Sequence, residues 1–304
     1  MEYILRTEKL CKNYGRSRAL NGLDMNVPKG AIYGFVGRNG AGKTTLIRMI
    51  CSLQYPSSGT FELYGVKNTD PKFGKAARRM GAVVETPSIH LNMSAEANLK
   101  QQHILLGLPS YDDIPEILKL VRLSDTGNKP AKNFSLGMKQ RLGIAMALCG
   151  DPDLLILDEP INGLDPQGIV EIRELILKLN REREITFIIS SHILDELSRL
   201  ATHYGFIDDG RIVREMSAEE LEQTTRKSVR INVDDTGVLS RVLDEMGFEY
   251  KILDGNNADI YGKPHFSTLA QALAKENCSI SSMQEHDESL EGFYMSLVGG
   301  DRNA

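Results

Sequence analysis

The stretch Gly37-Arg38-Asn39-Gly40-Ala41-Gly42-Lys43-Thr44 decides the fold of this chain. It matches the phosphate-binding pattern G-x-x-x-x-G-K-[ST], in which glycines let backbone N–H groups curl around a phosphate. The apolar run 31–36 before it predicts a buried strand, and residues 45–52 after it predict a helix whose N-terminus adds positive potential. Strand, glycine loop and helix together predict a nucleotide site, with the candidate binding residues Arg38, Asn39, Gly40, Ala41, Gly42, Lys43, Thr44 and Thr45.

Two side chains of this stretch carry the chemistry that a nucleotide needs. Lys43 is placed to reach the β- and γ-phosphates, and the hydroxyl of Thr44 is a ligand for Mg²⁺. The stretch therefore predicts a nucleoside triphosphate and Mg²⁺ as the cofactors.

The composition is that of an ordinary globular protein. The 304 residues suffice for one large domain or two smaller ones, and the hydrophobic content of 41% and charged content of 25% are usual. A net charge of -5 gives no general attraction to nucleic acid or anionic lipid. No apolar run approaches the ~18 to 20 residues of a membrane span, and the first residues lack the layout of a signal peptide. We therefore expect a cytoplasmic protein that does not bind nucleic acid.

The cysteines do not suggest a metal or redox site. Cys11, Cys51, Cys149 and Cys278 are widely scattered, and no C-x-x-C pair occurs. We expect them to serve as small buried hydrophobic residues.

The part of the chain before residue 150 alternates between strand and helix patterns. Residues 2–37 predict an antiparallel set of strands that leads into the phosphate loop. A further apolar strand is expected at 81–85, and the segment 86–149 predicts an insertion of helices. The candidate core positions of the first strands are Ile4, Leu10, Leu20, Leu23, Met25 and Val27.

Acidic and polar side chains follow two predicted buried strands. The run 154–159 consists of four apolar residues followed by Asp158 and Glu159, and the run 185–189 leads into Ser190, Ser191 and His192. Open α/β sheets bind ligands at the carboxyl ends of their parallel strands, so we expect these side chains near the phosphate loop.

Tyr14 and Ser135 are ambiguous when each is taken alone. Tyr14 precedes the phosphate loop and would stack on adenine, but a surface tyrosine in a turn explains it equally well. Ser135 lies where the N-cap of a helix belongs.

A polar linker at 224–227 separates a C-terminal part from the rest. Beyond it, strand and helix patterns follow the order β-α-β-β-α-β-α up to residue 297, which predicts a small α+β domain of ferredoxin-like type with a helical tail. We expect one domain over 1–223 and a second over 228–304. A ligand sensor and a packing or dimer-support module are both compatible with this second domain.

Later motifs resemble those of ABC ATPases. Residues 134–141, Phe-Ser-Leu-Gly-Met-Lys-Gln-Arg, resemble the signature motif that is often written LSGGQ. The run 154–159 resembles the Walker B strand, 163–165 resembles the D-loop, and His192 resembles the switch histidine. The order and spacing match over about 2–222. Within the family, the chain is most similar to the ATP-binding subunits of bacitracin-type and lantibiotic-immunity exporters, which also carry a small C-terminal extension.

The resemblance implies a P-loop NTPase fold with a mixed sheet, an antiparallel β subdomain and a helical insertion. It implies that Lys43 neutralises phosphate oxygens, that Thr44 and Asp158 hold Mg²⁺, and that Glu159 activates water while His192 senses the γ-phosphate. The alternative is that Glu159 is a second carboxylate in the shell around the metal and does not activate water.

The resemblance also implies partners. Ser135, Gly137 and Met138 would contact the ATP of a second protomer, so that two ATP molecules join a homodimer or pseudo-homodimer. The usual partner of such a dimer is a separate membrane permease, which would place this chain on the inner face of the cell membrane. The expected function is an ATPase motor of an exporter of peptide antibiotics or other amphipaths. A soluble ABC ATPase without a transport role and a non-transport sensor are the alternatives.

Two positions depart from the family pattern. Leu136 and Met138 stand where Gly and Gln are commonest in the signature, and Glu85 stands where a Gln usually follows the strand. Glu85 would approach Mg²⁺ or its water, or else face the permease and pair with a basic residue there. Because residues 85–88 resemble the bacitracin-type variant, we interpret Glu85 as a subfamily feature.

Overall fold

The computed structural model describes residues 2–224, 227–262, 264–287 and 290–299. Contacts between Cα atoms divide the chain into two compact units, 1–218 and 219–304. Thr225 and Arg226 of the expected linker lie outside the described residues. The domain limits expected from the sequence, 1–223 and 228–304, remain a prediction, because grouping by contacts does not show which part folds alone.

The first sheet of unit 1 is antiparallel and has the strand order β2-β1-β4-β5. Its alternating burial leaves one face apolar and the other polar, as expected for a sheet that covers a core on one side. The strands are β1 (Tyr3–Tyr14), β2 (Ser17–Pro28), β4 (Ser58–Leu63) and β5 (Val66–Lys67).

The second sheet of unit 1 has the order β10-β9-β3-β8-β7-β6. Its pairs are parallel except for the edge pair of β10 with β9, so the sheet is mixed. The strands are β3 (Ile32–Gly37), β6 (Met80–Val83), β7 (Leu154–Asp158), β8 (Thr186–Ser191), β9 (His203–Asp208) and β10 (Arg211–Ser217).

Two strand predictions need correction. The segment 2–37 is not wholly antiparallel, because β3 pairs in parallel with β8 and β9 and is buried along its whole length. The expected strand 81–85 ends at Val83, and Glu85 has a φ of 61°, a left-handed conformation that an extended strand does not contain.

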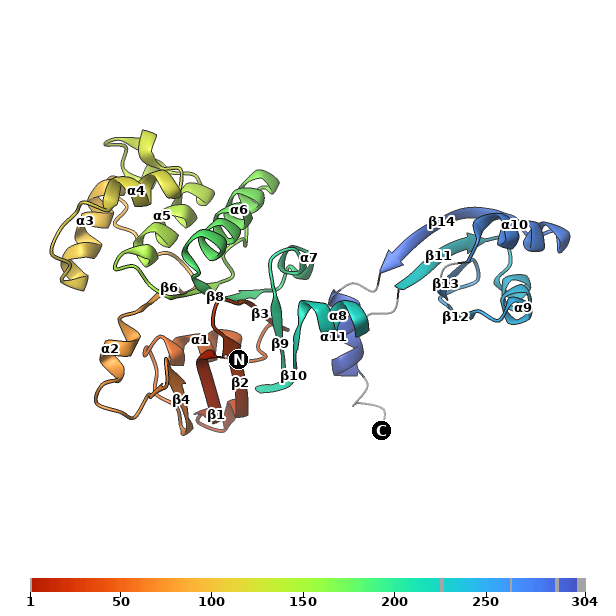
Figure 1. Cartoon of the computed structure of the whole chain (residues 1–304), viewed down its shortest axis with the longest axis horizontal. Helices are drawn as coiled ribbons and strands as arrows, with labels where there is room; N and C mark the ends of the chain where they lie inside the picture. Colours follow the sequence, from red (N-terminus) through yellow and green to blue (C-terminus); the bar gives the residue numbers. More distant parts are fainter. Residues whose placement is uncertain (1, 225–226, 263, 288–289, 300–304) are drawn as a thin grey trace. The chain divides into compact units, whose positions relative to one another are not determined.

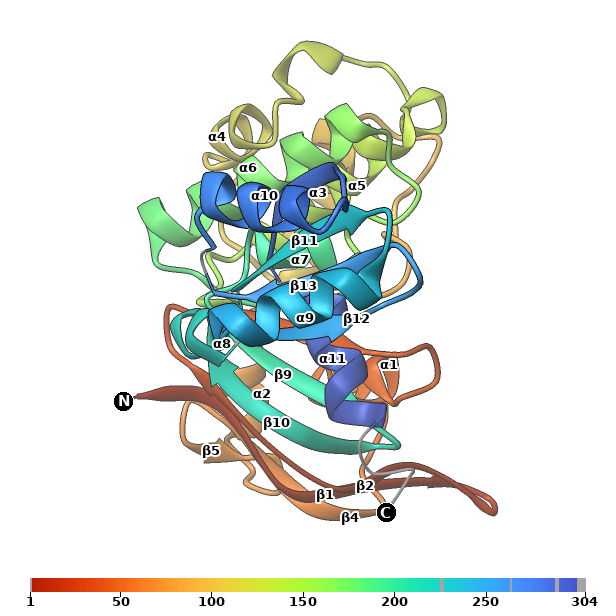
Figure 2. The same cartoon turned by 90° about the vertical axis from the view of Figure 1, so that its right-hand side faces the viewer.

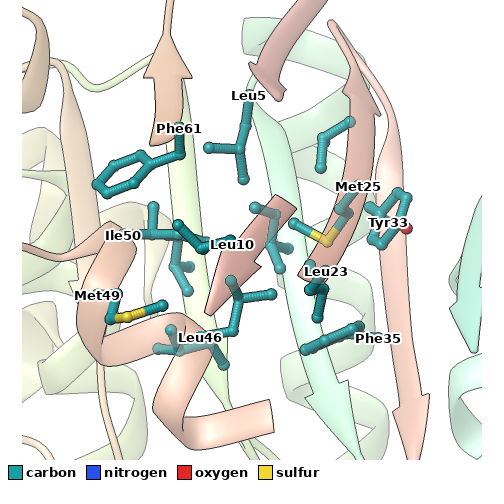
Figure 3. Close-up of a cluster of buried hydrophobic side chains, with 14 of the residues drawn as sticks. Leu5, Leu10, Leu23, Met25, Tyr33, Phe35, Leu46, Met49, Ile50 and Phe61 are labelled. Atoms are coloured by element: carbon teal, nitrogen blue, oxygen red, sulfur yellow. The ribbon is translucent and has the colours of Figure 1, made fainter. Parts of the chain in front are cut away.

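The main core of unit 1 lies between these two sheets and around helix α1 (Lys43–Ile50). Figure 3 shows Leu46, Met49 and Ile50 of α1 facing Leu10 and Leu23 of the antiparallel sheet. All six candidate core positions of the first strands are buried, at 0–3% exposure. Burial of such side chains contributes on the order of 1.5–3 kcal/mol each, which anchors the helix that begins at the phosphate loop.

The remaining helices of unit 1 include the predicted insertion. Figures 1 and 2 both show α3, α4 and α5 together on one side of the unit, away from β1, β2 and β4. The helices are α2 (Phe73–Ala77), α3 (Ala95–Leu106), α4 (Ile114–Leu120), α5 (Leu136–Leu148), α6 (Pro166–Arg183) and α7 (Leu194–Ser198), with short 3₁₀ turns η1 (Ser124–Thr126) and η2 (Ala131–Asn133).

Unit 2 has the ferredoxin-like topology that the sequence predicts. Its sheet has the order β12-β13-β11-β14 with antiparallel neighbours, and α9 and α10 pack on one face through an apolar cluster. The elements are α8 (Ala218–Thr224), β11 (Lys227–Val233), α9 (Thr236–Met246), β12 (Glu249–Ile252), β13 (Asn257–Tyr261), α10 (Phe266–Lys275), β14 (Ile280–Asp287) and α11 (Leu290–Gly299). Across the described residues of both units, every helix is too short or too polar to cross a membrane.

Candidate functional site

The phosphate loop connects β3 to α1 and depends on its glycines. Gly40 and Gly42 have φ values of 84° and 112°, which other residues rarely adopt. A Cβ atom on Gly42 would lie 2.7 Å from the carbonyl oxygen of Ala19, so the loop has no room for a side chain there. Arg38, Asn39 and Gly40 are exposed, Ala41 and Gly42 are buried, and Thr44 and Thr45 are half-buried.

Lys43 is buried at the first position of α1, with 7% of its surface exposed. Its Nζ donates to the carbonyl oxygens of Gly37 at 2.5 Å and Arg38 at 3.2 Å, so the loop folds over its own lysine. Burial lowers the pKa of the Lys43 ammonium, and the charges of Glu159 and Asp158 oppose this shift without cancelling it. The charges that oppose the shift come from the two acids at the end of β7.

Asp158 joins three elements at the carboxyl edge of the parallel strands. Its side chain accepts the hydroxyl of Thr44 at 3.1 Å and the hydroxyl of Ser190 at 2.5 Å. Asp158 is 2% exposed, and the two hydroxyl donors satisfy the buried oxygens of its side chain. The structure thus brings together Thr44 and Asp158, two of the three residues that the sequence predicts at Mg²⁺, and the third, Glu85, pairs with Arg48 instead.

Glu159 follows β7 in a strained conformation, with a φ of 52°. Its N–H donates to the Ser190 carbonyl oxygen at 3.1 Å and to the Ser190 hydroxyl at 3.0 Å, which hold this turn in place. Its Oε2 contacts Nδ1 of His192 at 2.6 Å and accepts the His192 N–H at 3.3 Å. Two of the three predicted catalytic residues, Glu159 and His192, are therefore in direct contact, and Lys43 is the third.

Ser190 is the site residue that sequence reasoning missed. The sequence places it after the buried run 185–189, where no local pattern indicates a role for it. The parallel pairing of β7 with β8 sets Asp158 opposite Ser190, and this register depends on the sheet order. A hydroxyl residue at the end of the strand adjacent to the acidic strand is the signal that would have identified it.

The signature residues lie on a different element. Ser135 is the N-cap of α5 and accepts the N–H of Met138 at 3.2 Å, while Gly137 lies near the side chain of Leu164. Among the described residues, Ser135 has no hydrogen bond to Lys43 or Thr44. The N-terminus of this 13-residue helix, like other helix N-termini, is suited to binding a phosphate.

Neither Glu85 nor Tyr14 belongs to the group of residues around Asp158, which consists of Thr44, Ser190 and Asp158 itself. Glu85 forms an ion pair with Arg48 of α1, and both side chains are partly exposed, at 54% and 37%. Tyr14, the last residue of β1, is 45% exposed. Its hydroxyl forms a hydrogen bond with Gln54, and Nζ of Lys12 lies 5.4 Å from the centroid of its ring. The basic partner of Glu85 is thus found within this chain, and Tyr14 is partly exposed with Lys12 over its ring.

The donor set fits Mg²⁺. In the described part of the chain, no three His, Cys, Asp or Glu side chains gather as a metal cage. Magnesium at nucleotide sites uses only one or two protein oxygens together with water and phosphate oxygens. The hydroxyl of Thr44 and the carboxylate of Asp158 are hard oxygen ligands of this kind.

Comparisons with known proteins agree with this geometry. Residues 20–162 match the family model described as ABC transporter. The chain is 40% identical over 304 residues to the bacitracin transport ATP-binding protein BcrA of Bacillus licheniformis, covering 99% of each chain. It is 42% identical over 223 residues to the lantibiotic transport ATP-binding protein SrtF of Streptococcus pyogenes, covering 72% of this chain and 95% of the relative. Among solved structures, cbiO1 of Clostridium perfringens, part of an ABC transporter complex, is 29% identical with a TM-score of 0.66, covering 81% of this chain and 97% of cbiO1.

Proposed function

This chain belongs to the ABC transporter family as an ATP-binding, ATP-hydrolysing subunit, and from that premise we propose that it is the motor of a peptide-antibiotic exporter whose membrane permease is a separate protein. The coverage of the relatives supports the substrate class. The bacitracin transport protein matches along the whole chain, including residues 219–304, whereas the lantibiotic transport protein matches only 72% of it. We therefore favour a bacitracin-like cyclic or amphipathic peptide as the cargo.

The contact between Glu159 and His192 is the observation on which the proposed mechanism rests. With Nδ1 of His192 against Glu159 Oε2, the ring nitrogen assigned to the γ-phosphate is Nε2. His192 then holds the carboxylate at the edge of the phosphate site, where Glu159 accepts a proton from the attacking water. Lys43 neutralises the oxygens that gain charge during phosphoryl transfer.

Thr44 and Asp158 are the proposed Mg²⁺ ligands, directly or through water. Ser190 fixes the Asp158 carboxylate from the other side, as second-layer hydrogen bonds do at metal sites. When bound, Mg²⁺ supplies charge neutralisation for the β- and γ-phosphates. We propose that Glu85, whose partner Arg48 lies on α1 four residues after Thr44, acts on the metal or its water.

Tyr14 is the proposed adenine platform, because its ring is exposed and lies beside a lysine. Ser135, Gly137 and Met138 are proposed to contact the ATP of a second protomer, because they form a helix N-terminus separate from the phosphate loop. Their role requires a dimer on ATP binding, held against the permease at the inner face of the membrane.

The test is reconstitution with the candidate permease. We expect the chain to co-purify with a multi-helix membrane protein, and bacitracin-like peptides to stimulate MgATP hydrolysis of the complex at least about twofold. The Glu159→Gln variant is the control and should bind the permease without hydrolysing ATP. Hydrolysis that no peptide stimulates, in a chain that binds no membrane protein, would instead support a non-transport ATPase.

A further inference from the structure

We propose that Arg173 and Glu196 are positioning residues for the ATPase site and that helix α6 is the strut that links His192 to the signature helix α5. The inference rests on the proposed role of His192 at the γ-phosphate. It concerns residues on α6 and α7 that touch neither the phosphate loop nor the carboxylates of the site.

The first link joins α6 to α7. Arg173 Nη1 lies 2.5 Å from Glu196 Oε2, and both side chains are only 18% exposed. A partly buried ion pair is less screened by solvent and more specific in geometry than an exposed one, and removing one partner leaves the other charge unsatisfied. Arg199 lies 3.8 Å from the other oxygen of Glu196 but is 62% exposed, so Arg173 is the main partner.

The short helix α7 begins two residues after His192, the proposed switch histidine. Its Leu197 is 1% exposed and packs over Gly34 of β3, with a Leu197 methyl 3.0 Å from where a Cβ atom on Gly34 would lie. Glu196, the preceding residue of the same helix, forms the ion pair with Arg173 of α6. A shift of α7 would move His192 away from Glu159, so the Arg173 contact defines where Nδ1 of His192 lies.

The second link leaves α6 on its other side. Glu171 pairs with Arg141 of α5 at 3.6 Å, with side-chain exposures of 23% and 15%. Residues two positions apart on a helix point in nearly opposite directions, so Glu171 and Arg173 reach different neighbours. Figure 1 shows α6 between α5 and α7, as these two pairs require.

Arg141 also connects α5 to α4. Its Nη1 donates to the carbonyl oxygens of Val121 and Arg122 at 3.3 and 3.2 Å, where the last carbonyls of α4 need donors. At the start of the same pair of helices, Leu136 of α5 lies against Gly163, before α6. Helix α6 and the segment just before it therefore contact the helix that Ser135 caps at two separate points.

These contacts form a continuous connection between two residues that we propose bind different ATP molecules. One end is His192, which faces the γ-phosphate of this chain's own ATP, and the other is Ser135, which faces the ATP of the partner protomer. The helices next to both ends, α7 and α5, are each joined to α6 by a partly buried ion pair, so we expect both ends to move with α6. Such an element couples the two sites only if it moves as a rigid body, which an 18-residue helix with a buried apolar face allows.

The test is a charge swap with a matched control on the same helix. In Arg173→Glu we expect the kcat of MgATP hydrolysis to fall roughly tenfold, with the KM for ATP within about twofold of wild type. The double variant Arg173→Glu/Glu196→Arg should recover at least about half of the lost kcat. The control is the swap Arg122→Glu/Glu174→Arg. This pair also joins α6 to the end of α4, but its side chains are 61% and 55% exposed, so the swap should leave kcat unchanged.

Melting temperature and ATP-induced stabilisation of each variant show whether it folds. If Arg173→Glu does not fold, Glu196→Gln, which removes one charge with little change in shape, replaces it with the same expectation. Unchanged kcat in a folded Arg173→Glu or Glu196→Gln, or no recovery in the swap, would overturn the inference. A wild-type chain without ATPase activity would instead overturn the proposed function, so the two failures are distinguishable.

Discussion

Ser190 donates its hydroxyl hydrogen to Asp158 across two neighbouring parallel strands, at an Oγ–Oδ1 distance of 2.5 Å. The same hydroxyl oxygen accepts the N–H of Glu159 at 3.0 Å. One small side chain therefore orients the proposed metal ligand and the proposed catalytic base together. This arrangement makes the position of Ser190 as important as that of the two acids.

Replacing Ser190 by alanine should weaken metal use. The buried Asp158 carboxylate would lose one of its two hydroxyl donors, and loss of such a partner costs metal sites about 10- to 100-fold in affinity or activity. We expect the Mg²⁺ concentration for half-maximal ATPase activity to rise about tenfold. The control is Ser191→Ala, since Ser191 bonds Ile193 and not Asp158. An unchanged Mg²⁺ dependence would contradict the role of Ser190.

Glu159→Gln should bind ATP and lose turnover. A general base contributes about 10²- to 10⁴-fold to rate, and Gln accepts no proton at neutral pH. We expect kcat to fall at least about 100-fold and a dimer to accumulate in MgATP, measured by size-exclusion chromatography with light scattering. Glu174→Gln, on the exposed side of α6, is the control. Near-normal ATPase activity in Glu159→Gln would refute its assignment as the base.

Lys43→Ala should weaken ATP binding itself. Hydrogen bonds to charged groups contribute about 1.5–3 kcal/mol, so the Kd for ATP should rise roughly 10- to 100-fold. The thermal shift produced by MgATP should shrink accordingly, because ligand stabilisation follows occupancy. An equal shift in wild type and variant would mean that the phosphate loop is not the main anchor. Lys178→Ala, far along α6, controls for loss of a positive charge.

Glu85→Gln tests the departure from the usual glutamine. Like charges at about 4 Å cost about 1 kcal/mol in water, so removal of the Glu85 charge should tighten metal-free ATP binding by up to about fivefold. It should also make binding depend less on Mg²⁺. Calorimetry with and without Mg²⁺ measures both effects. The pair with Arg48 already offsets part of the Glu85 charge, so Arg48→Gln should act in the opposite direction. Equal affinities in all conditions would leave coupling to the permease as the better account of Glu85.

Alkaline pH should destabilise the fold through Cys149. Burial raises the pKa of the Cys149 thiol from 9.0 to about 12, and Cys149 is 6% exposed. Between these values the unfolded chain loses the thiol proton while the folded chain keeps it, so stability is complete below pH 9 and declines above it. The decline is about 1.4 kcal/mol per pH unit from this group. Urea unfolding at pH 8 and pH 10 should therefore show a smaller loss in Cys149→Ala than in wild type. Equal losses would show that this thiol does not titrate as proposed.

The architecture of both units was predictable because its signals are local. Each pattern consists of neighbouring residues in the sequence. Examples are the glycine loop between a buried strand and a helix, and the apolar strand that is followed by Asp158 and Glu159. Capping by Ser135 and the alternating patterns of 229–297 are local in the same sense. The strand ends at Val83 and not at residue 85, and an apolar pattern does not reveal that Glu85 adopts a left-handed conformation.

The sequence by itself therefore determined the phosphate loop, the two acids at a strand end, the helical insertion and the ferredoxin-like order of the second unit. The tertiary structure alone decided which side chains meet. Ser190 and Asp158 are 32 positions apart, Arg173 and Glu196 are 23 apart, and Arg48 and Glu85 are 37 apart. No local pattern encodes these pairs, because each depends on the order of strands in the mixed sheet and on which face of α1 or α6 is turned toward its neighbour.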